Sequence, residues 1–135
     1  MRPVIAVLTS LAILIFAIPG VATNAPSDDL LALKGLAKGA WIIRFRDGIS
    51  QRQICFQGGQ ELIQLHARHA GKNCSFFLIE NRDSQATIQY NCQGDGYGRT
   101  EIRVETRSLI QIESQGIAAG RPFNLAGEGR RTGSC

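Results

Sequence analysis

Apolar and polar residues alternate along most of this chain, which is typical of β-strands with one buried face. The clearest case is the segment 74–92, where two alternating runs flank Asn-Arg-Asp-Ser, a sequence that favours a turn. A hairpin centred on Asp83 buries one face, and a slip of one residue would bury polar amides instead. The cross-strand pairs predicted are Cys74 with Cys92, Phe76 with Tyr90, Leu78 with Ile88, and Glu80 with Ala86.

The same alternation predicts five further strands, so the fold class is mainly β, an antiparallel meander of about seven strands. We expect a bent sheet or a small barrel, because closure hides edge strands. Phe77 and Ile79 add a second apolar face to the first hairpin strand, and a helix is expected to cover them. The five strands are expected at 41–45, 51–56, 99–107, a run through Ile110 and Ile112, and 123–127.

Two helices are predicted beside the strands. Ser27, followed by two aspartates, has the features of an N-cap, so residues 23–38 should contain a short helix. Residues 60–70 should form the main helix and pack on the sheet, since Leu62, Leu65, His66 and His69 recur at helical spacing.

The start of the chain has the layout of a secretory signal peptide. Met1-Arg2-Pro3 is basic, residues 4–18 are almost wholly apolar, and Pro19-Gly20 ends the run. The run is shorter than the roughly 20 residues that span a bilayer, so the processed protein is not expected to be integral to the membrane. We expect a signal peptide at 1–22, cleaved after Ala22, with Ala25 as the alternative. The domain at 39–135 would then lie in the periplasm or outside the cell.

Four cysteines in the domain predict two disulfides, because their number is even and the chain is expected to be exported. Pairing Cys55 with Cys74 and Cys92 with Cys135 is favoured, because the first two flank the helix at 60–70 and would share one end of the sheet. The hairpin register supports a rival pairing, Cys74 with Cys92 and Cys55 with Cys135.

Charge and polar motifs point to few chemistries. The net charge is only +4, and the charges at 99–107 alternate in sign, so a nucleic-acid partner is not expected. His66 and His69 are the only metal candidates, and no acidic residue completes a motif, so no metal or other cofactor is expected. Trp41 is expected in the core, with ligand contact as the alternative. Arg130 and Arg131 are candidates for an anion contact.

Several of these features occur together in one known family. Gly39-Ala40-Trp41 gives G-x-W, Cys55 follows the second strand, the Cys74 to Cys92 hairpin comes next, and Arg131 to Cys135 gives R-x-G-x-C. This arrangement resembles the bacterial exported family catalogued as domain of unknown function 3617. The resemblance implies a small antiparallel β protein of Gram-negative bacteria with no established activity. A short helix before G-x-W is also similar to the start of lipocalin-type barrels.

The sequence contains no catalytic motif, because its two histidines share one predicted helix and its cysteines are expected to be oxidised. We therefore expect a periplasmic module that is not an enzyme and binds a ligand or is associated with the envelope. Two alternatives are a lipocalin-like carrier of a small apolar ligand and a protein that binds an envelope polyanion. The arginines for the polyanion would be Arg44, Arg46, Arg130 and Arg131.

Overall fold

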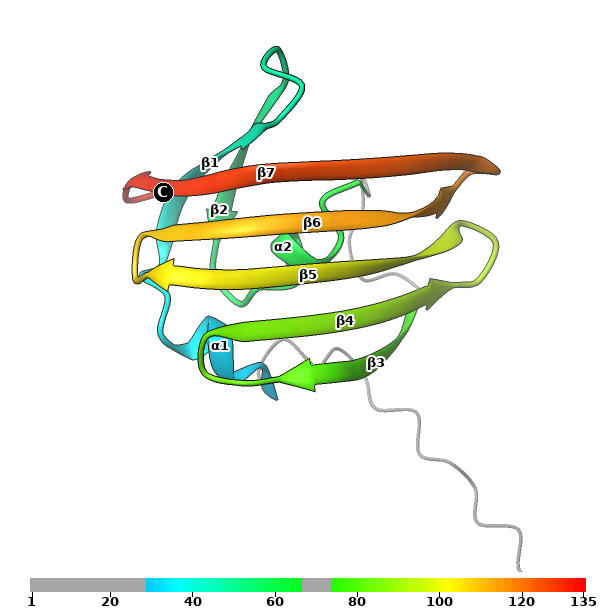
Figure 1. Ribbon diagram of the computed structural model, residues 1–135, viewed down its shortest axis with the longest axis horizontal. Helices are drawn as coiled ribbons and strands as arrows, with labels where there is room; N and C mark the ends of the chain where they lie inside the picture. The colour runs from blue at the N-terminus through cyan, green and yellow to red at the C-terminus, as the bar shows by residue number, and fades with distance from the viewer. Residues whose placement is uncertain (1–28, 67–73) are drawn as a thin grey trace, which may run out of the picture.

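A computed structural model describes residues 29–66 and 74–135 (Figure 1). Seven antiparallel strands form one open sheet in the order β2-β1-β7-β6-β5-β4-β3. The prediction of a mainly β fold is confirmed, and of the two expected forms the sheet is open rather than closed into a barrel. Strands β3 to β7 form a meander, and β1 lies beside β7. The strands are β1 (Gly39–Phe45), β2 (Gln51–Phe56), β3 (Cys74–Asn81), β4 (Gln85–Cys92), β5 (Gly96–Thr106), β6 (Leu109–Ala118) and β7 (Arg121–Gly133).

The sheet encloses one core between its long strands and the helices. Figure 1 shows β1 and β2 crossing steeply behind β5, β6 and β7, with α1 (Leu31–Lys34) and α2 (Gln60–Ile63) on that same side. Trp41 is 1% exposed there; its indole N–H donates to the Ala37 carbonyl oxygen at 3.0 Å. Its ring also contacts Phe56 edge to face, at 6.1 Å between centroids. Trp41 thus lies in the core, as expected.

The first helix is short, as expected, but the second is shorter than the sequence predicts. The first begins at Leu31, and Ser27, its predicted cap, lies outside the described residues. The second was expected at 60–70, but α2 ends at Ile63 and a turn follows to residue 66. Gln64 has non-helical backbone angles (φ −113°, ψ 52°), and the Ile63 carbonyl oxygen accepts a hydrogen bond from the Thr100 hydroxyl at 2.6 Å. Contacts with the sheet thus replace a further helical turn.

The hairpin of β3 and β4 has the predicted register over its first five residues. Cys74 faces Cys92, Phe76 faces Tyr90 and Leu78 faces Ile88. A bulge at Ile79 then shifts the pairing, so that Glu80 faces Thr87 and the predicted pair with Ala86 is wrong.

The expectation that a helix covers Phe77 and Ile79 is also wrong. Phe77 is 68% exposed and Ile79 is 52% exposed. The reason is that α2 buries Leu62 and Ile63 in the core, on the side that Phe76 faces, whereas Phe77 points to the opposite side of the sheet.

The disulfides are Cys55–Cys135 and Cys74–Cys92, so the favoured pairing is wrong and its rival is correct. The favoured pairing assumed that β2 and β3 are neighbours, but they form opposite edges of the sheet. Ala40 pairs with Cys55 on one side and with Gly133 on the other, so the end of β7 brings Cys135 to Cys55.

Thr100 connects β5 to β6 and to α2 through buried hydrogen bonds. Its hydroxyl donates to Ile63 and lies 2.8 Å from the Ser114 hydroxyl, and both side chains are almost wholly buried. Thr100→Val is expected to lower the free energy of unfolding by about 1–3 kcal/mol, because it leaves polar partners unsatisfied. Thr100→Ser should cost less in the same urea titration. If Thr100→Ser cost as much as Thr100→Val, packing of the methyl group would contribute as much to stability as the hydroxyl group does.

Candidate functional site

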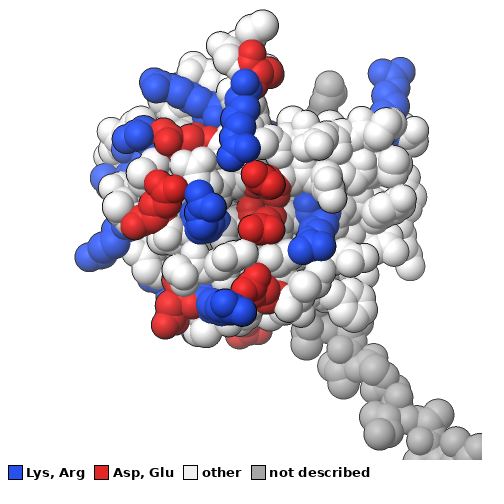
Figure 2. Space-filling view, in the orientation of Figure 1, with Lys and Arg blue, Asp and Glu red and all other residues white. Residues whose placement is uncertain are grey.

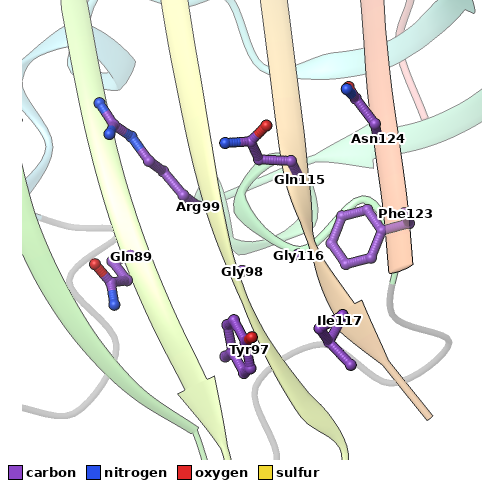
Figure 3. A pocket seen from close by; sticks show the side chains of 9 residues that line it. All are labelled: Gln89, Tyr97, Gly98, Arg99, Gln115, Gly116, Ile117, Phe123 and Asn124. Atoms are coloured by element: carbon purple, nitrogen blue, oxygen red, sulfur yellow. The ribbon is translucent and has the colours of Figure 1, made fainter. Parts of the chain in front are cut away.

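An open groove of about 450 Å³ crosses the outer face of the sheet from β4 to β7 (Figure 3). Alternation along the strands places it there: Thr100 and Ser114 point into the core, whereas Arg99 and Gln115 are exposed. The groove therefore lies on the side away from α2. The lining residues are Gln89, Tyr97, Gly98, Arg99, Gln115, Gly116, Ile117, Phe123 and Asn124.

The groove has a polar end and an apolar end. Arg99, Gln115 and Asn124 lie together at one end, and Tyr97 and Ile117 lie at the other (Figure 3). Phe123 is aligned across the strands with Gly116, Gly98 and the buried Tyr90, so its side chain points to the inner side of the sheet. There its ring stacks on His66 with 4.5 Å between centroids and 5° between planes. Because Tyr97 is 54% exposed, one of its faces is available to a ligand. The arrangement suits a molecule with one polar and one apolar part.

The polar side chains of the groove are available to bind a ligand. Within the described residues, Arg99 makes no ion pair, and the amides of Gln89, Gln115 and Asn124 make no hydrogen bond through their side chains. Among the described residues, Arg99 is the only charged one in the lining. An anionic group at the polar end would therefore meet a free guanidinium and the free amides of Gln115 and Asn124.

The surface around the groove differs from the rest of this face. In Figure 2, Lys, Arg, Asp and Glu are interspersed over one half of the face, and the half where the strands carry the groove is largely uncharged. A smaller hollow of about 180 Å³ continues from the polar end and adds Glu101 and Glu113 to Arg99. These carboxylates limit the negative charge of a ligand that Arg99 can hold, since they repel a second negative group.

The residues proposed from the sequence lie elsewhere. Arg130 forms an ion pair with Glu128 at 2.6 Å, and this hydrogen bond is the main reason that the pKa of Glu128 lies below its ordinary value. The Arg131 side chain donates to the Lys38 carbonyl oxygen at 2.8 Å, and Arg46 lies 3.4 Å from Glu113. Trp41 is buried. None of these residues lines the groove.

Of the two histidines proposed as metal candidates, only His66 lies within the described residues. His66 is exposed and stacks on Phe123, and His69 lies outside the described ranges. In 29–66 and 74–135, no three His, Cys, Asp or Glu side chains are placed to hold one ion. The same ranges contain no helix long and apolar enough to cross a membrane.

Sequence reasoning missed the groove. It treated Arg99 as one member of a run of charges that alternate in sign along 99–107. The sequence did contain a signal for the groove. Outward positions are charged along much of β5, whereas the outward positions beside Arg99 on β4, β6 and β7 are the amides Gln89, Gln115 and Asn124. That change marks the uncharged half of the face, although it becomes visible only when the strand order is known.

Comparison with known proteins gives no relative from which a role could be carried over. No family model, no curated protein and no solved structure matches this chain.

Proposed function

We propose that this protein is a binding module without enzymatic activity and that the groove holds a small amphipathic ligand with one anionic group. The observation that carries the proposal is the free Arg99 at the polar end of a groove whose other end is apolar. A guanidinium beside amides is well suited to a carboxylate, sulfate or phosphate group. Tyr97 and Ile117 would contact a ring or a short alkyl chain.

The positions of the other candidates favour this groove over the alternatives. In a lipocalin-like carrier the ligand would lie inside the sheet, but Trp41 and Tyr90 fill that space as core residues. For a polyanion, Arg46 and Arg130 are paired with carboxylates and Arg131 donates to a carbonyl group. Tyr97 and Arg99 are the only ionisable residues of the lining in the part of the chain that the structure describes, which supports binding rather than catalysis.

We also propose that the module acts outside the cytoplasm, in the periplasm or beyond the cell. The signal-like segment at 1–22 supports export, and two disulfides fit an oxidising compartment. Membership of the family of domain of unknown function 3617, which the sequence resembles, would be consistent with this location.

Arg99→Gln should separate binding of charged probes from binding of neutral probes. Anilinonaphthalene sulfonate and neutral N-phenyl-naphthylamine share their rings but differ in the sulfonate. The substitution is expected to weaken the sulfonate probe about 10-fold and to change the neutral one by less than about 2-fold, because only the charge-assisted hydrogen bond is lost. Amide chemical shifts would be measured, since they distinguish the groove from other apolar surface.

The matched control is Arg103→Gln, which removes a charge from the same face of β5. Arg103 is already paired with Glu105 at 3.3 Å and does not line the groove. It should leave both affinities unchanged. Shift changes that avoid Gln89, Tyr97, Gln115 and Asn124 at saturating probe would refute the groove as the site. Equal losses in the Arg99 and Arg103 variants would refute the specific role of Arg99.

A further inference from the structure

Strand β3 has an apolar edge that the described part of the chain leaves uncovered. It ends the sheet and pairs with β4 alone. Phe77, Leu78 and Ile79 are three consecutive large apolar residues, exposed by 68%, 40% and 52%. Exposed apolar edge strands are normally protected by charges or proline, because they otherwise pair with other chains. From Cys74 to Ile79, β3 contains neither.

We infer that this edge pairs with the same edge of a second copy, joining two sheets about a two-fold axis. The opposite edge strand, β2, differs from β3. It begins with Gln51, Arg52 and Gln53, and polar or charged residues of this kind protect an edge from pairing with another chain. The inference is independent of the ligand proposed for the groove.

The backbone groups of Phe76 and Leu78 in β3 have the spacing that antiparallel pairing needs. Cys74 and Cys92 have Cα atoms 4.0 Å apart, which matches a pair that exchanges no hydrogen bonds, for which about 4.5 Å is usual. Because the two kinds of pair alternate, Phe76 and Leu78 also belong to this kind. Their N–H and C=O groups therefore point away from β4, toward the open edge.

A second copy is the natural complement of this strand. If Phe76 pairs with Leu78 of the second copy, each exchanges two backbone hydrogen bonds, and Phe77 faces its own counterpart across the axis. No charges of like sign meet over residues 74–79, and beyond them Glu80 is neutralised by Arg82 at 2.9 Å. Asn81 limits the free edge, because its side chain is bonded to Asp29 and Leu31.

The expected dimer is weak and closed. One strand pair buries less than the roughly 1,200–2,000 Å² of a standard interface, so half-association is expected on the order of 100 μM. A two-fold axis uses the same edge of both copies, so association should stop at two.

Sedimentation equilibrium of the purified oxidised protein, from about 10 μM to about 1 mM, tests the inference. Phe77→Lys is expected to raise the dissociation constant of the dimer by about 10-fold or more, because it places two lysines of like charge opposite each other across the axis. Ile49→Lys is the matched control. Ile49 is 92% exposed in the β1–β2 turn, far from this edge in the sheet order, so the same gain of charge should leave association unchanged.

Hydrogen exchange supplies a second measurement that does not depend on a variant. The amides of Phe76 and Leu78 should exchange more slowly as protein concentration rises, while β2 amides stay constant. A wild-type protein that is monomeric at the highest concentration overturns the inference. So does growth beyond two copies, a dimer that survives Phe77→Lys, or protection on β2 instead of β3.

Discussion

Replacing Cys55 and Cys135 together with serine is expected to lower the free energy of unfolding by about 4–5 kcal/mol. The two residues are 80 apart in sequence, so their bond closes most of the domain into one loop and removes much of the freedom of the unfolded chain. It also fixes the end of β7 to the edge strand β2 across β1, which lies between them. Urea unfolding of the double variant beside the oxidised wild type measures the loss.

Replacing the other pair, Cys74 and Cys92, is the matched control. That bond spans 18 residues across a hairpin, and the same chain-entropy relation gives about 3 kcal/mol. The long bond should therefore stabilise the domain more than the short one. If removing the short bond costs clearly more, loop length does not determine the contribution of these disulfides.

Gly98→Ala is expected to lower the free energy of unfolding by about 2–3 kcal/mol, the cost of overfilling a packed site. Gly98 lies on the inner face of β5, opposite Tyr90 on β4. A Cβ atom there would overlap the Tyr90 ring and hydroxyl, including Cε1 at 2.9 Å. Tyr90 is only 6% exposed and has little room to move. Thermal or urea unfolding of the variant measures the cost.

A double-mutant cycle assigns that cost to the ring. In a Tyr90→Leu background, Gly98→Ala should cost less than about 1 kcal/mol, because the overlapping atoms are gone. Gly35→Ala is the control, since no atom lies within 4 Å of its added Cβ and its φ of −81° suits alanine. An undiminished cost in the Tyr90→Leu background would mean that the backbone, and not Tyr90, excludes a side chain at Gly98.

These two results would also bear on the groove, because Gly98 belongs to its lining. The absence of a side chain at Gly98 lets Tyr90 lie flat under β5 on the inner side, while Tyr97 and Arg99 project on the outer side. A shift of Tyr90 would disturb the strand that carries both binding residues. Gly98→Ala should therefore impair stability and the groove together, whereas Arg99→Gln should impair binding alone.

Local alternation was enough to predict the strands and several of their pairings. Ile102, Ile110 and Ile112 are buried, as the predicted inward parity of the two strands requires, although parity alone did not fix which of them pair. The pair of Phe76 with Tyr90 follows from the same rule and from the turn residues between β3 and β4. Such features depend on neighbours in sequence, because burying one face and closing a short turn leave only one register without exposed apolar or buried polar side chains.

The tertiary structure decided which strands that are distant in sequence lie side by side. The pairing of β7 with β1 brought Cys135 to Cys55, and the placement of β3 at an edge left Phe77 and Ile79 exposed. The groove likewise depends on four strands lying in the order β4 to β7. Alternation assigns each residue to a face of its own strand, but it does not specify the neighbouring strand, because long-range pairing reflects the packing of the whole core.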